Sequence, residues 1–422
     1  MRNLKDSGIE WIGEIPRNKR IIRNKYLLEY TKGKLPVDTN FEGTGFPYIG
    51  ATDLDSHEPC KTYTRDETLP DACDSDLLVL WDGARAGLCG THKVGKVSST
   101  IVRIREVDST IYRPFLYWYY KGFEDYMYQR VNGTTIPHMN RKYIEEIQMI
   151  DWTIQEQCRI VDYLDRKCSQ IDAIIARQQE VIEKLKAYKL SVITEAVTKG
   201  LNPNVPMKNS GVEWIGEIPE HWKMVRLKFL LSHIIDCPHE TPIYSADGDY
   251  LVIRTADQDL GKLRTDEDMY RLDEGEYQNR IRRMPLEKDD IVYGREGERW
   301  GLACLVPESN KYCLGQRMLQ FRCKRELFLP RFAMWALNSK FVYLQGAVDT
   351  IGSTSPHVNI STVRNFLIPV PNINEQQEII EYVDKKMLQL DKEVEHRGML
   401  IRKLNEYKKS LIYEVVTGKK EV

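Results

Sequence analysis

Two long stretches of the chain place apolar residues at alternating spacings of three and four, with charged residues between them. A spacing near 3.5 residues is typical of a helix that buries one stripe against a partner helix. We therefore predict long helices at residues 153–200 and 374–422. The apolar positions are Ile160, Leu164, Ile171, Ile174, Val181, Leu185, Tyr188 and Val192 in the first stretch, and Ile379, Val383, Leu390, Leu400, Leu404, Tyr407 and Leu411 in the second.

Each predicted helix carries about six heptads and, at about 1.5 Å per residue, forms a rod roughly 65 Å long. Two matched stripes on one chain can bury each other as an antiparallel coiled coil. Polar residues interrupt both stripes, at Gln178 in the first and at Glu393 and Arg397 in the second. Such interruptions commonly fix the register and orientation of a coiled coil.

The regions at 1–152 and 201–373 show a different pattern. Short β-branched and aromatic runs alternate there with clusters of Gly, Pro, Asn and Asp, as expected for strands and turns. An aromatic-rich helix is predicted from Pro114 to Gln129. Each region is predicted to be an α+β domain, with the strand order left open. The strand-like runs lie at 48–52, 76–81, 99–104, 250–255, 289–294 and 318–323.

The chain repeats itself. SGIEWIGEIP at 7–16 returns as SGVEWIGEIP at 210–219, and the segment from Glu156 to Thr198 matches the segment from Glu375 to Thr417 without a gap. A whole domain with its connector has therefore been duplicated, which predicts a pseudo-two-fold chain of two tandem domains separated by the two long helices. A further echo links Gly133, Thr135, Pro137 and His138 to Gly352, Thr354, Pro356 and His357.

The composition argues against a membrane span, a secretory signal and a metal site. No run of about eighteen apolar residues occurs, so no membrane span is expected, and the N-terminus lacks the apolar core of a secretory signal. Nine cysteines without a CxxC pair favour reduced thiols in a cytoplasm. The pairs Cys89/His92 and Cys237/His239 lack a second half at ligand spacing, so no metal site is expected. The net charge of −1 decides little, because nucleic-acid binding depends on how charge is distributed.

The motifs that resemble catalytic ones are incomplete. GTHKVGKV at 90–97 nearly matches a phosphate-binding loop, but Val97 stands where a hydroxyl should meet magnesium, and a strand follows where a helix is needed. FEGTG at 41–45 resembles the glycine loop of S-adenosylmethionine methyltransferases without the buried strand before it. LEKDD at 286–290 is one contiguous polar loop. No catalytic constellation is recognised, which favours a binding protein with no cofactor of its own.

The repeated WIGEIP segment has two interpretations. In the first, Trp11 and Trp214 anchor the start of each domain to the neighbouring rod. In the second, the exposed indoles bind a partner. The structural interpretation is the more economical one, because each segment opens a domain.

Basic residues cluster in loops between the predicted strands. Such charges are often a solvated surface, but Arg and Lys also neutralise phosphates, and Arg reads guanine edges. The loops that end in Pro-His add hydroxyls and amides suited to phosphate. The candidate DNA-binding residues are Arg85, Lys93, Lys96, Thr134, Thr135, His138, Arg254, Arg280, Arg282, Arg283, Arg295, Arg299, Ser353, Thr354 and His357.

Four features together resemble the specificity subunit of type I restriction–modification enzymes. They are WIGEIP at each domain start, the turns Asp82 to Gly87 and Glu296 to Gly301, the loop GTTIPHMN at 133–140, and the strand IPVPNINEQQEII at 368–380 that leads into a heptad helix. The resemblance covers essentially the whole chain. The first copy departs from it at 150–157, where IDWTIQEQ lacks the prolines of the second.

The resemblance implies that each α+β domain is a target recognition domain for one half of a split, asymmetric site in double-stranded DNA. It implies an antiparallel coiled coil that spaces the domains, and two modification subunits docked on it. Those subunits would bind S-adenosylmethionine and methylate adenine, and restriction subunits would use ATP and magnesium. This chain would be non-catalytic, and it would reside in the cytoplasm of a bacterium or archaeon.

Two other functions remain open at this stage. A coiled-coil interaction scaffold would not read DNA sequence, so it would not prefer one bipartite duplex over a scrambled one. An orphan nuclease or ATPase built on the phosphate-loop-like segment would lose hydrolysis on Lys96→Ala.

Overall fold

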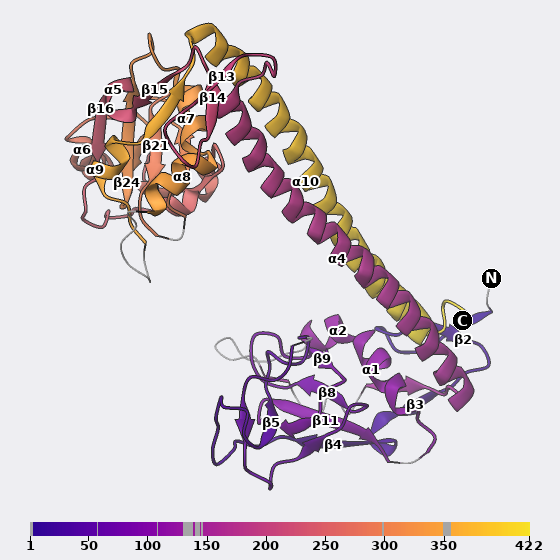
Figure 1. Cartoon of the computed structure of the whole chain (residues 1–422). Helices are drawn as coiled ribbons and strands as arrows, with labels where there is room; N and C mark the ends of the chain where they lie inside the picture. The colour runs from indigo at the N-terminus through magenta and orange to yellow at the C-terminus, as the bar shows by residue number, and fades with distance from the viewer. Residues whose placement is uncertain are drawn as a thin grey trace. The chain divides into compact units, whose positions relative to one another are not determined.

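The computed structural model describes residues 3–56, 58–107, 109–129, 138–139, 144, 147–297, 299–348 and 356–422. The chain divides into two compact units, Met1–Gln179 with Gly398–Val422, and Glu180–Arg397. Each unit contains one β-rich domain and one part of each long helix, α4 (Ile154–Lys199) and α10 (Ile373–Val416) (Figure 1). Both helices are continuous over the stretches that carry the heptad pattern.

The first domain contains two sheets within the described residues. One is antiparallel with the order β4-β11-β8-β9, and the other has the order β6-β5-β10-β7 with β5 and β10 parallel. Strand β8 reads LLVL and is buried at every position, as a central strand requires. The bounds are β4 (Leu28–Lys32), β5 (Phe46–Ile49), β6 (Tyr63–Thr64), β7 (Asp71–Ala72), β8 (Leu77–Leu80), β9 (Cys89–Gly90), β10 (Gly95–Val97), β11 (Ile101–Glu106), α1 (Arg113–Lys121) and α2 (Glu124–Gln129).

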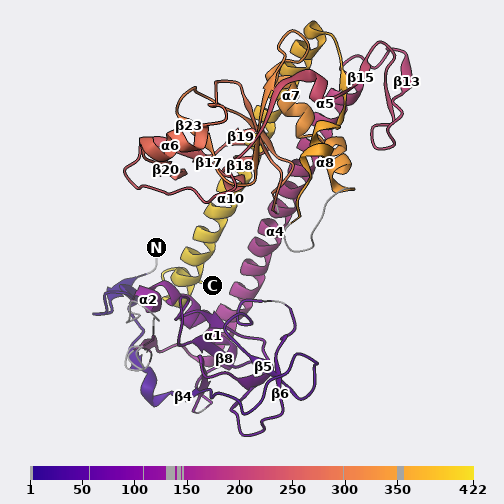
Figure 2. The ribbon, with the colours of Figure 1, turned by 90° about the vertical axis from the view of Figure 1, so that its left-hand side faces the viewer.

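The second domain repeats the antiparallel sheet and the parallel pair of the first. Its antiparallel sheet has the order β16-β24-β21-β22, and its second sheet, β20-β17-β23, again contains a parallel pair (Figure 2). The predicted α+β class with an internal repeat is confirmed. The bounds are α5 (Leu227–Leu230), β16 (Leu231–Asp236), β17 (Tyr250–Ile253), β18 (Gln258–Asp259), β19 (Lys262–Leu263), β20 (Tyr270–Leu272), α6 (Glu274–Ile281), β21 (Ile291–Gly294), β22 (Ala303–Leu305), β23 (Tyr312–Leu314), β24 (Met318–Cys323), α7 (Pro330–Leu337), α8 (Lys340–Ala347) and α9 (Ile360–Arg364).

Short strand pairs join each domain to its helices. In the first unit β1 (Leu4–Asp6) pairs with β2 (Glu14–Pro16), and β3 (Ile21–Arg23) pairs with β12 (Gln148–Ile150) just before α4. The second unit repeats both pairs. There, β13 (Met207–Asn209) pairs with β14 (Glu217–Pro219), and β15 (Lys223–Arg226) pairs with β25 (Leu367–Val370) just before α10.

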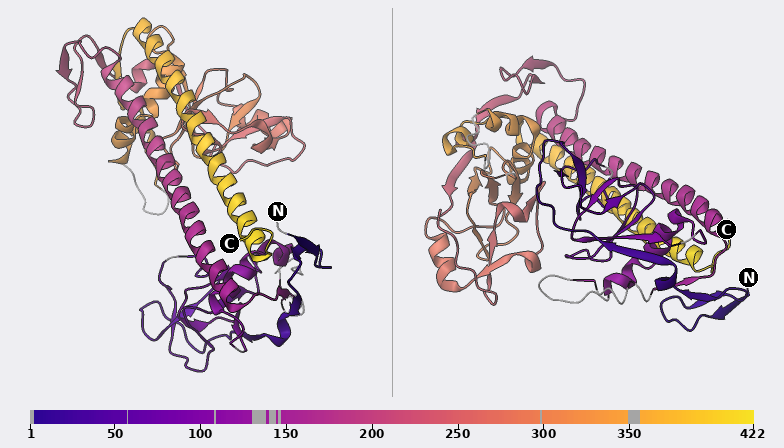
Figure 3. Two further views of the ribbon diagram at one scale, coloured as in Figure 1. Left: turned by 90° about the vertical axis from the view of Figure 1, so that its right-hand side faces the viewer. Right: turned by 90° about the horizontal axis from the view of Figure 1, so that it is seen from below.

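The WIGEIP segments anchor through their isoleucines more than through their tryptophans. Ile12 is buried in the core of the first unit, and its carbonyl accepts a hydrogen bond from the Tyr413 hydroxyl of α10 at 2.9 Å. The N-terminal segment lies near the C-terminal end of α10 in both views of Figure 3. Trp11 packs on Phe123, with ring centroids 4.4 Å apart. Trp214, its counterpart, is 43% exposed. The segment as a whole is therefore structural, but its tryptophan differs between the copies.

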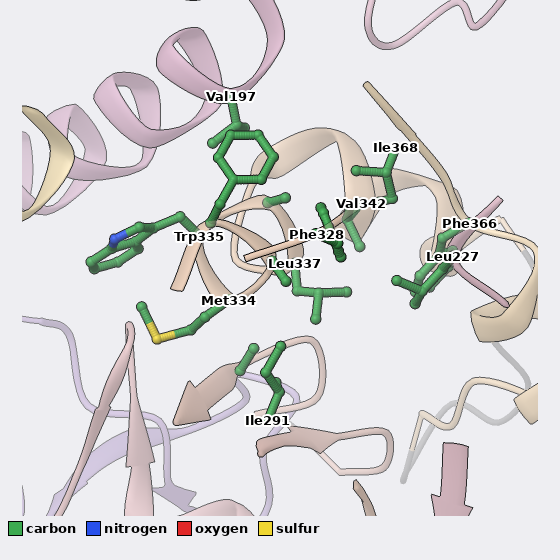
Figure 4. Close-up of a cluster of buried hydrophobic side chains, with 14 of the residues drawn as sticks. Val197, Leu227, Ile291, Phe328, Met334, Trp335, Leu337, Val342, Phe366 and Ile368 are labelled. Carbon is green, nitrogen blue, oxygen red and sulfur yellow. The ribbon is translucent and has the colours of Figure 1, made fainter. Parts of the chain in front are cut away.

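The end of each long helix completes the core of the domain beside it. In the second unit Val197 of α4 points into a cluster formed by α7, α8 and the surrounding strands (Figure 4). Phe328 and Phe366 are fully buried there. Because apolar side chains of the helix end are part of the core, removing the helix would expose that core to water. No helix among the described residues is long and apolar enough to cross a membrane.

The same buried bonds fasten each domain to its helix. The Trp118 indole donates to Asp165 of α4 at 2.8 Å, and Trp335 donates to Asp384 of α10 at 2.9 Å. Gln157 is buried near the start of α4 and bonds the backbone at Thr110, Tyr112 and Trp152. Gln376 of α10 makes the equivalent bonds to Leu327, Leu329 and Pro371. The duplication has therefore kept its polar anchors in both copies.

Candidate nucleic-acid interface

Two motifs that are far apart in the sequence meet in each domain. Asp82 opens the first glycine turn two residues after the end of β8 and forms an antiparallel bridge with His138. Glu296 opens the second turn after β21 and forms the same bridge with His357. The histidines of the Pro-His motifs and the glycine turns therefore meet at one place, which we call the corner. It comprises Lys32, Trp81, Asp82 and His138 in the first domain, and Asp236, Arg295, Glu296, Arg317 and His357 in the second.

The glycines of each turn are required by its backbone. Gly87 has a φ of 97° and donates from its amide to the Leu80 carbonyl at 2.7 Å. Gly301 has a φ of 91° and donates to the Gly294 carbonyl at the same distance. Residues with a side chain rarely adopt this left-handed region. The turn therefore reverses the chain within a few residues and presents its first residue at the corner.

The corner of the first domain holds a carboxylate between two basic groups. Asp82 lies 2.7 Å from Nδ1 of His138 and 3.3 Å from Nζ of Lys32. The Lys32 ammonium also lies over the Trp81 ring, 5.5 Å from its centroid. The Lys32 side chain is 49% exposed and the Asp82 side chain 20%. The carboxylate is thus oriented by the protein while the lysine stays open to solvent.

The corner of the second domain holds a carboxylate between two arginines. Glu296 lies 3.0 Å from the Arg295 guanidinium and 3.7 Å from Nε of Arg317. Arg295 is buried and also pairs with Asp236 at 3.4 Å. Arg317 is 54% exposed and has a φ of 67°, a left-handed conformation that is uncommon for such a large side chain. Backbone strain of this kind is concentrated at functional sites.

Arg317 was not among the residues singled out from the sequence. It lies in LGQRM just before β24, and nothing in that string indicates a left-handed residue. One signal was available. The strand-like run MLQFRC begins directly after Arg317, which indicated a position at a strand end, but the pairing of that end with the strand before the glycine turn required the structure.

One arginine occurs at the same place in both turns. Arg85 contacts Asp55 at 2.6 Å and the Ala51 carbonyl at 3.0 Å. Arg299 donates to the Gln258 carbonyl and lies 3.9 Å from Asp259. The Arg85 and Arg299 side chains are 48% and 46% exposed. Each one ties its turn to the segment that follows the first strand of the parallel pair and keeps part of its guanidinium in water.

Several sequence candidates hold the fold together instead of facing solvent. Arg280 is 4% exposed and donates to three backbone carbonyls, those of Leu314, Glu240 and Pro238. Lys96 is equally buried and donates to the carbonyls of Glu67 and Leu69. Arg254 pairs with Asp257 at 2.8 Å and stacks on the Tyr270 ring. A guanidinium or ammonium whose donors are used inside the protein is a poor candidate for DNA contact.

The remaining candidates lie nearer the surface. Arg282 and Arg283 are exposed at the end of α6, and Arg283 donates to the Asp236 carbonyl at 2.8 Å, next to the corner. Lys93 is half-buried and donates to the Ser56 carbonyl. Thr134, Thr135, Ser353 and Thr354 lie outside the residues that the structure describes.

The phosphate-loop-like segment does not form a phosphate cradle. Gly95–Val97 is strand β10, buried and paired with β5, so Lys96 does not precede a helix N-terminus. The cysteines are free thiols, and burial raises the pKa of Cys304 and of Cys313 to about 12. Among the described residues no three His, Cys, Asp or Glu side chains are grouped to hold a metal ion.

Comparison with known proteins agrees with this architecture. A family model described as the type I restriction modification DNA specificity domain matches residues 219–396. The chain is 26% identical to the MjaVIII specificity subunit of Methanocaldococcus jannaschii, over 96% of this chain and 93% of that protein. It is 21% identical to the EcoBI specificity subunit of Escherichia coli, over 81% of this chain and 73% of that protein. A chain from a solved type I restriction–modification system superposes with a TM-score of 0.68 and 15% identity, covering 95% and 98% of the two chains.

The superposed chain shares the fold described here, with two β-rich domains of similar topology joined to two long helices. Residues 219–396 match the DNA specificity domain of type I restriction–modification systems, and the whole chain is similar to specificity subunits of those systems. This similarity indicates a non-catalytic subunit that recognises the DNA target within a restriction–modification complex.

Proposed function

We propose that this chain reads a bipartite, asymmetric DNA site, with one half of the site bound by each β-rich domain. The observation that carries the proposal is the repeated corner, which has one backbone geometry in both domains but different side chains. A common frame with different side chains would make the two half-sites different in sequence. Each domain would use the side of its sheet where the glycine turn meets His138 or His357.

The two long helices would set the number of base pairs between the half-sites. Both helices are continuous, over Ile154–Lys199 and Ile373–Val416, and each enters the core of a domain. One turn of B-DNA spans about 34–36 Å, and rods roughly 65 Å long can hold two readers more than one turn apart. The base pairs between the half-sites would then be counted by the protein without being touched.

The duplicated chain would bind two copies of one partner. An internal pseudo-two-fold repeat offers the same surface twice, which suits two modification subunits. In the proposed complex those subunits carry S-adenosylmethionine and methylate adenine in each half-site. Restriction subunits that use ATP and magnesium complete it. This chain itself would bind the DNA and position the partner subunits on it.

The candidate residues would divide between phosphate and base contacts. Arg85 and Arg299 are common to both turns, so they suit phosphate, which is the same at every site. Lys93, Arg282 and Arg283 would add charge around the bound backbone. Residues that differ between the corners would discriminate bases.

A binding competition tests this proposal against the scaffold alternative. The chain is purified with its modification subunits, and a duplex that carries the target sequence competes with one whose second half is scrambled. The proposal predicts that scrambling either half weakens binding at least about a thousandfold. Equal affinity for both duplexes would leave only the scaffold function.

A further inference from the structure

We infer that each corner reads a G·C base pair in the major groove, through Arg317 with Glu296 in the second domain and Lys32 with Asp82 in the first. This inference rests on the proposed DNA-reading function and adds the base class that each corner selects.

The first argument is the arrangement of charge. In both corners a half-exposed cation stands beside a carboxylate that the protein orients from its other side. Lys32 is 49% exposed beside Asp82, and Arg317 is 54% exposed beside Glu296. The carboxylates are only 20% and 23% exposed, so they are fixed in direction but still reachable.

The second argument is chemical complementarity. In the major groove a G·C pair presents two acceptors, N7 and O6 of guanine, next to one donor, N4 of cytosine. A cation facing guanine and a carboxylate facing cytosine satisfy all three groups. An A·T pair presents a donor between two acceptors and adds the thymine methyl group. A carboxylate placed against the thymine edge would meet an acceptor and a methyl group, so the corner would reject an A·T pair with adenine in the place of guanine. With thymine in that place, the cation would meet one acceptor, O4, instead of two, so this pair would bind more weakly than G·C.

The third argument comes from comparing the copies. The carboxylate keeps its place at the first residue of the turn in both domains. The cation does not, because Lys32 ends strand β4, whereas Arg317 directly precedes β24. In the second domain Asp236 lies at the sheet position that Lys32 occupies in the first. Lys32 pairs with the second residue of β11, and Asp236 pairs with the second residue of β24. The property shared by the two corners is thus the charge pair itself, supplied from different positions.

The geometry of Arg317 leaves its guanidinium available. Its distance of 3.7 Å to Glu296 is longer than a hydrogen bond, so the ion pair steers the side chain without saturating it. The left-handed backbone at φ 67° turns the residue out of the sheet edge before β24 begins. A residue held in this conformation only to stabilise the fold would be better replaced by glycine or asparagine.

A methylation assay on a duplex library tests the inference. The chain is purified with its modification subunits, and the library is randomised at one half-site while the other is kept intact. The wild type is expected to require G·C at one position in each half. Arg317→Ala is expected to lose about ten- to a hundredfold discrimination at that position of the second half and to leave the first half unchanged. Lys32→Ala should do the opposite.

The control is Arg325→Ala, because Arg325 is 63% exposed, pairs with Asp289 at 3.2 Å and lies away from the corner of the same domain. It should leave both preferences intact. Two results would overturn the inference while leaving the proposed function in place. One is a bipartite preference without a G·C requirement in either half. The other is a uniform fall in methylation in Arg317→Ala and Lys32→Ala with base preference unchanged. A wild-type complex that shows no preference for a bipartite site would instead contradict the proposed function.

Discussion

The ammonium of Lys408 on α10 lies 2.6 Å from the carboxylate of Asp172 on α4. The gap-free match between the two helices places Lys189 and Asp391 at the corresponding positions, and these two residues also form an ion pair. One interhelical contact therefore occurs twice, once in each unit. It shows that the helices run antiparallel in both units and that the duplicated register has been kept.

The Lys408–Asp172 pair is expected to contribute modestly to stability. The Asp172 side chain is 54% exposed, and exposed pairs contribute about 0.2–1 kcal/mol. Lys408→Glu should lower the free energy of unfolding, and the double variant Lys408→Glu with Asp172→Lys should recover most of the loss. Urea unfolding of the four proteins in this cycle measures the coupling. If the double variant is as unstable as the sum of the single variants, the contact does not set the register.

Asp391 is predicted to make stability depend on pH at the acidic end. Burial raises its pKa, but hydrogen bonds from Lys189 and Lys262 outweigh burial, so the pKa lies below its usual value. A carboxylate with a lowered folded pKa stabilises the fold above its unfolded pKa of about 3.9, and this contribution is lost as pH falls through the folded value. Asp391→Asn should lower stability at pH 7 and flatten the decline below about pH 5. If the stability of Asp391→Asn fell as steeply with decreasing pH as that of the wild type, this prediction would be contradicted.

Gln376 and its neighbour Gln377 offer a matched pair. Gln376 is fully buried and makes three hydrogen bonds to backbone groups, whereas Gln377 is exposed and donates to the side chain of Glu381. Removing a buried amide leaves its partners unsatisfied at a cost of about 1–3 kcal/mol each. Gln376→Ala should therefore lower the melting temperature by several degrees, while Gln377→Ala should change it little. Equal effects would show that the anchor is not specific.

Arg85 and Arg299 are expected to act alike because both are proposed to contact phosphate. Arg85→Ala should weaken binding of the assembled complex to every duplex by a similar factor. It should also reduce the slope of log affinity against log salt by about one. Titration at several salt concentrations, with target and unrelated duplexes, measures both quantities. A change confined to one base position would show instead that Arg85 reads sequence.

The heptad pattern and the duplication were sufficient to predict the class of fold. The run at 318–323 is β24 itself, and the run at 76–81 contains β8. The predicted helix from Pro114 to Gln129 is interrupted at Gly122 and Phe123, so it forms α1 and α2. Tyr188 and Tyr407, assigned to the apolar stripe by spacing, are 51% and 53% exposed. The apolar face of each helix is wider than the part of it that contacts the partner helix.

The candidate site was harder to predict, because burial depends on contacts between distant segments. Arg280 and Arg283 are three residues apart, yet Arg280 is buried on backbone carbonyls and Arg283 is exposed. Nothing in QNRIRRMP distinguishes them. The glycine turn was visible as a motif, but its bridge to His138 or His357 required the structure.

The helices are expected to determine the gap in the recognised site. Inserting one heptad into α4 alone should break the register with α10 and abolish site-specific methylation. Matched insertions in α4 and α10 should restore it and lengthen the gap by about three base pairs, since a heptad adds about 10 Å and a base pair spans about 3.4 Å. If the matched insertions restored methylation with the original gap, the helices would not determine the gap length.

The most direct test is a map of methyladenine across a bacterial genome, made after co-expressing this chain with its modification subunits. The account predicts one split motif, with two different half-sites separated by a fixed number of unspecified base pairs. A short continuous palindrome, or methylation without any motif, would contradict it.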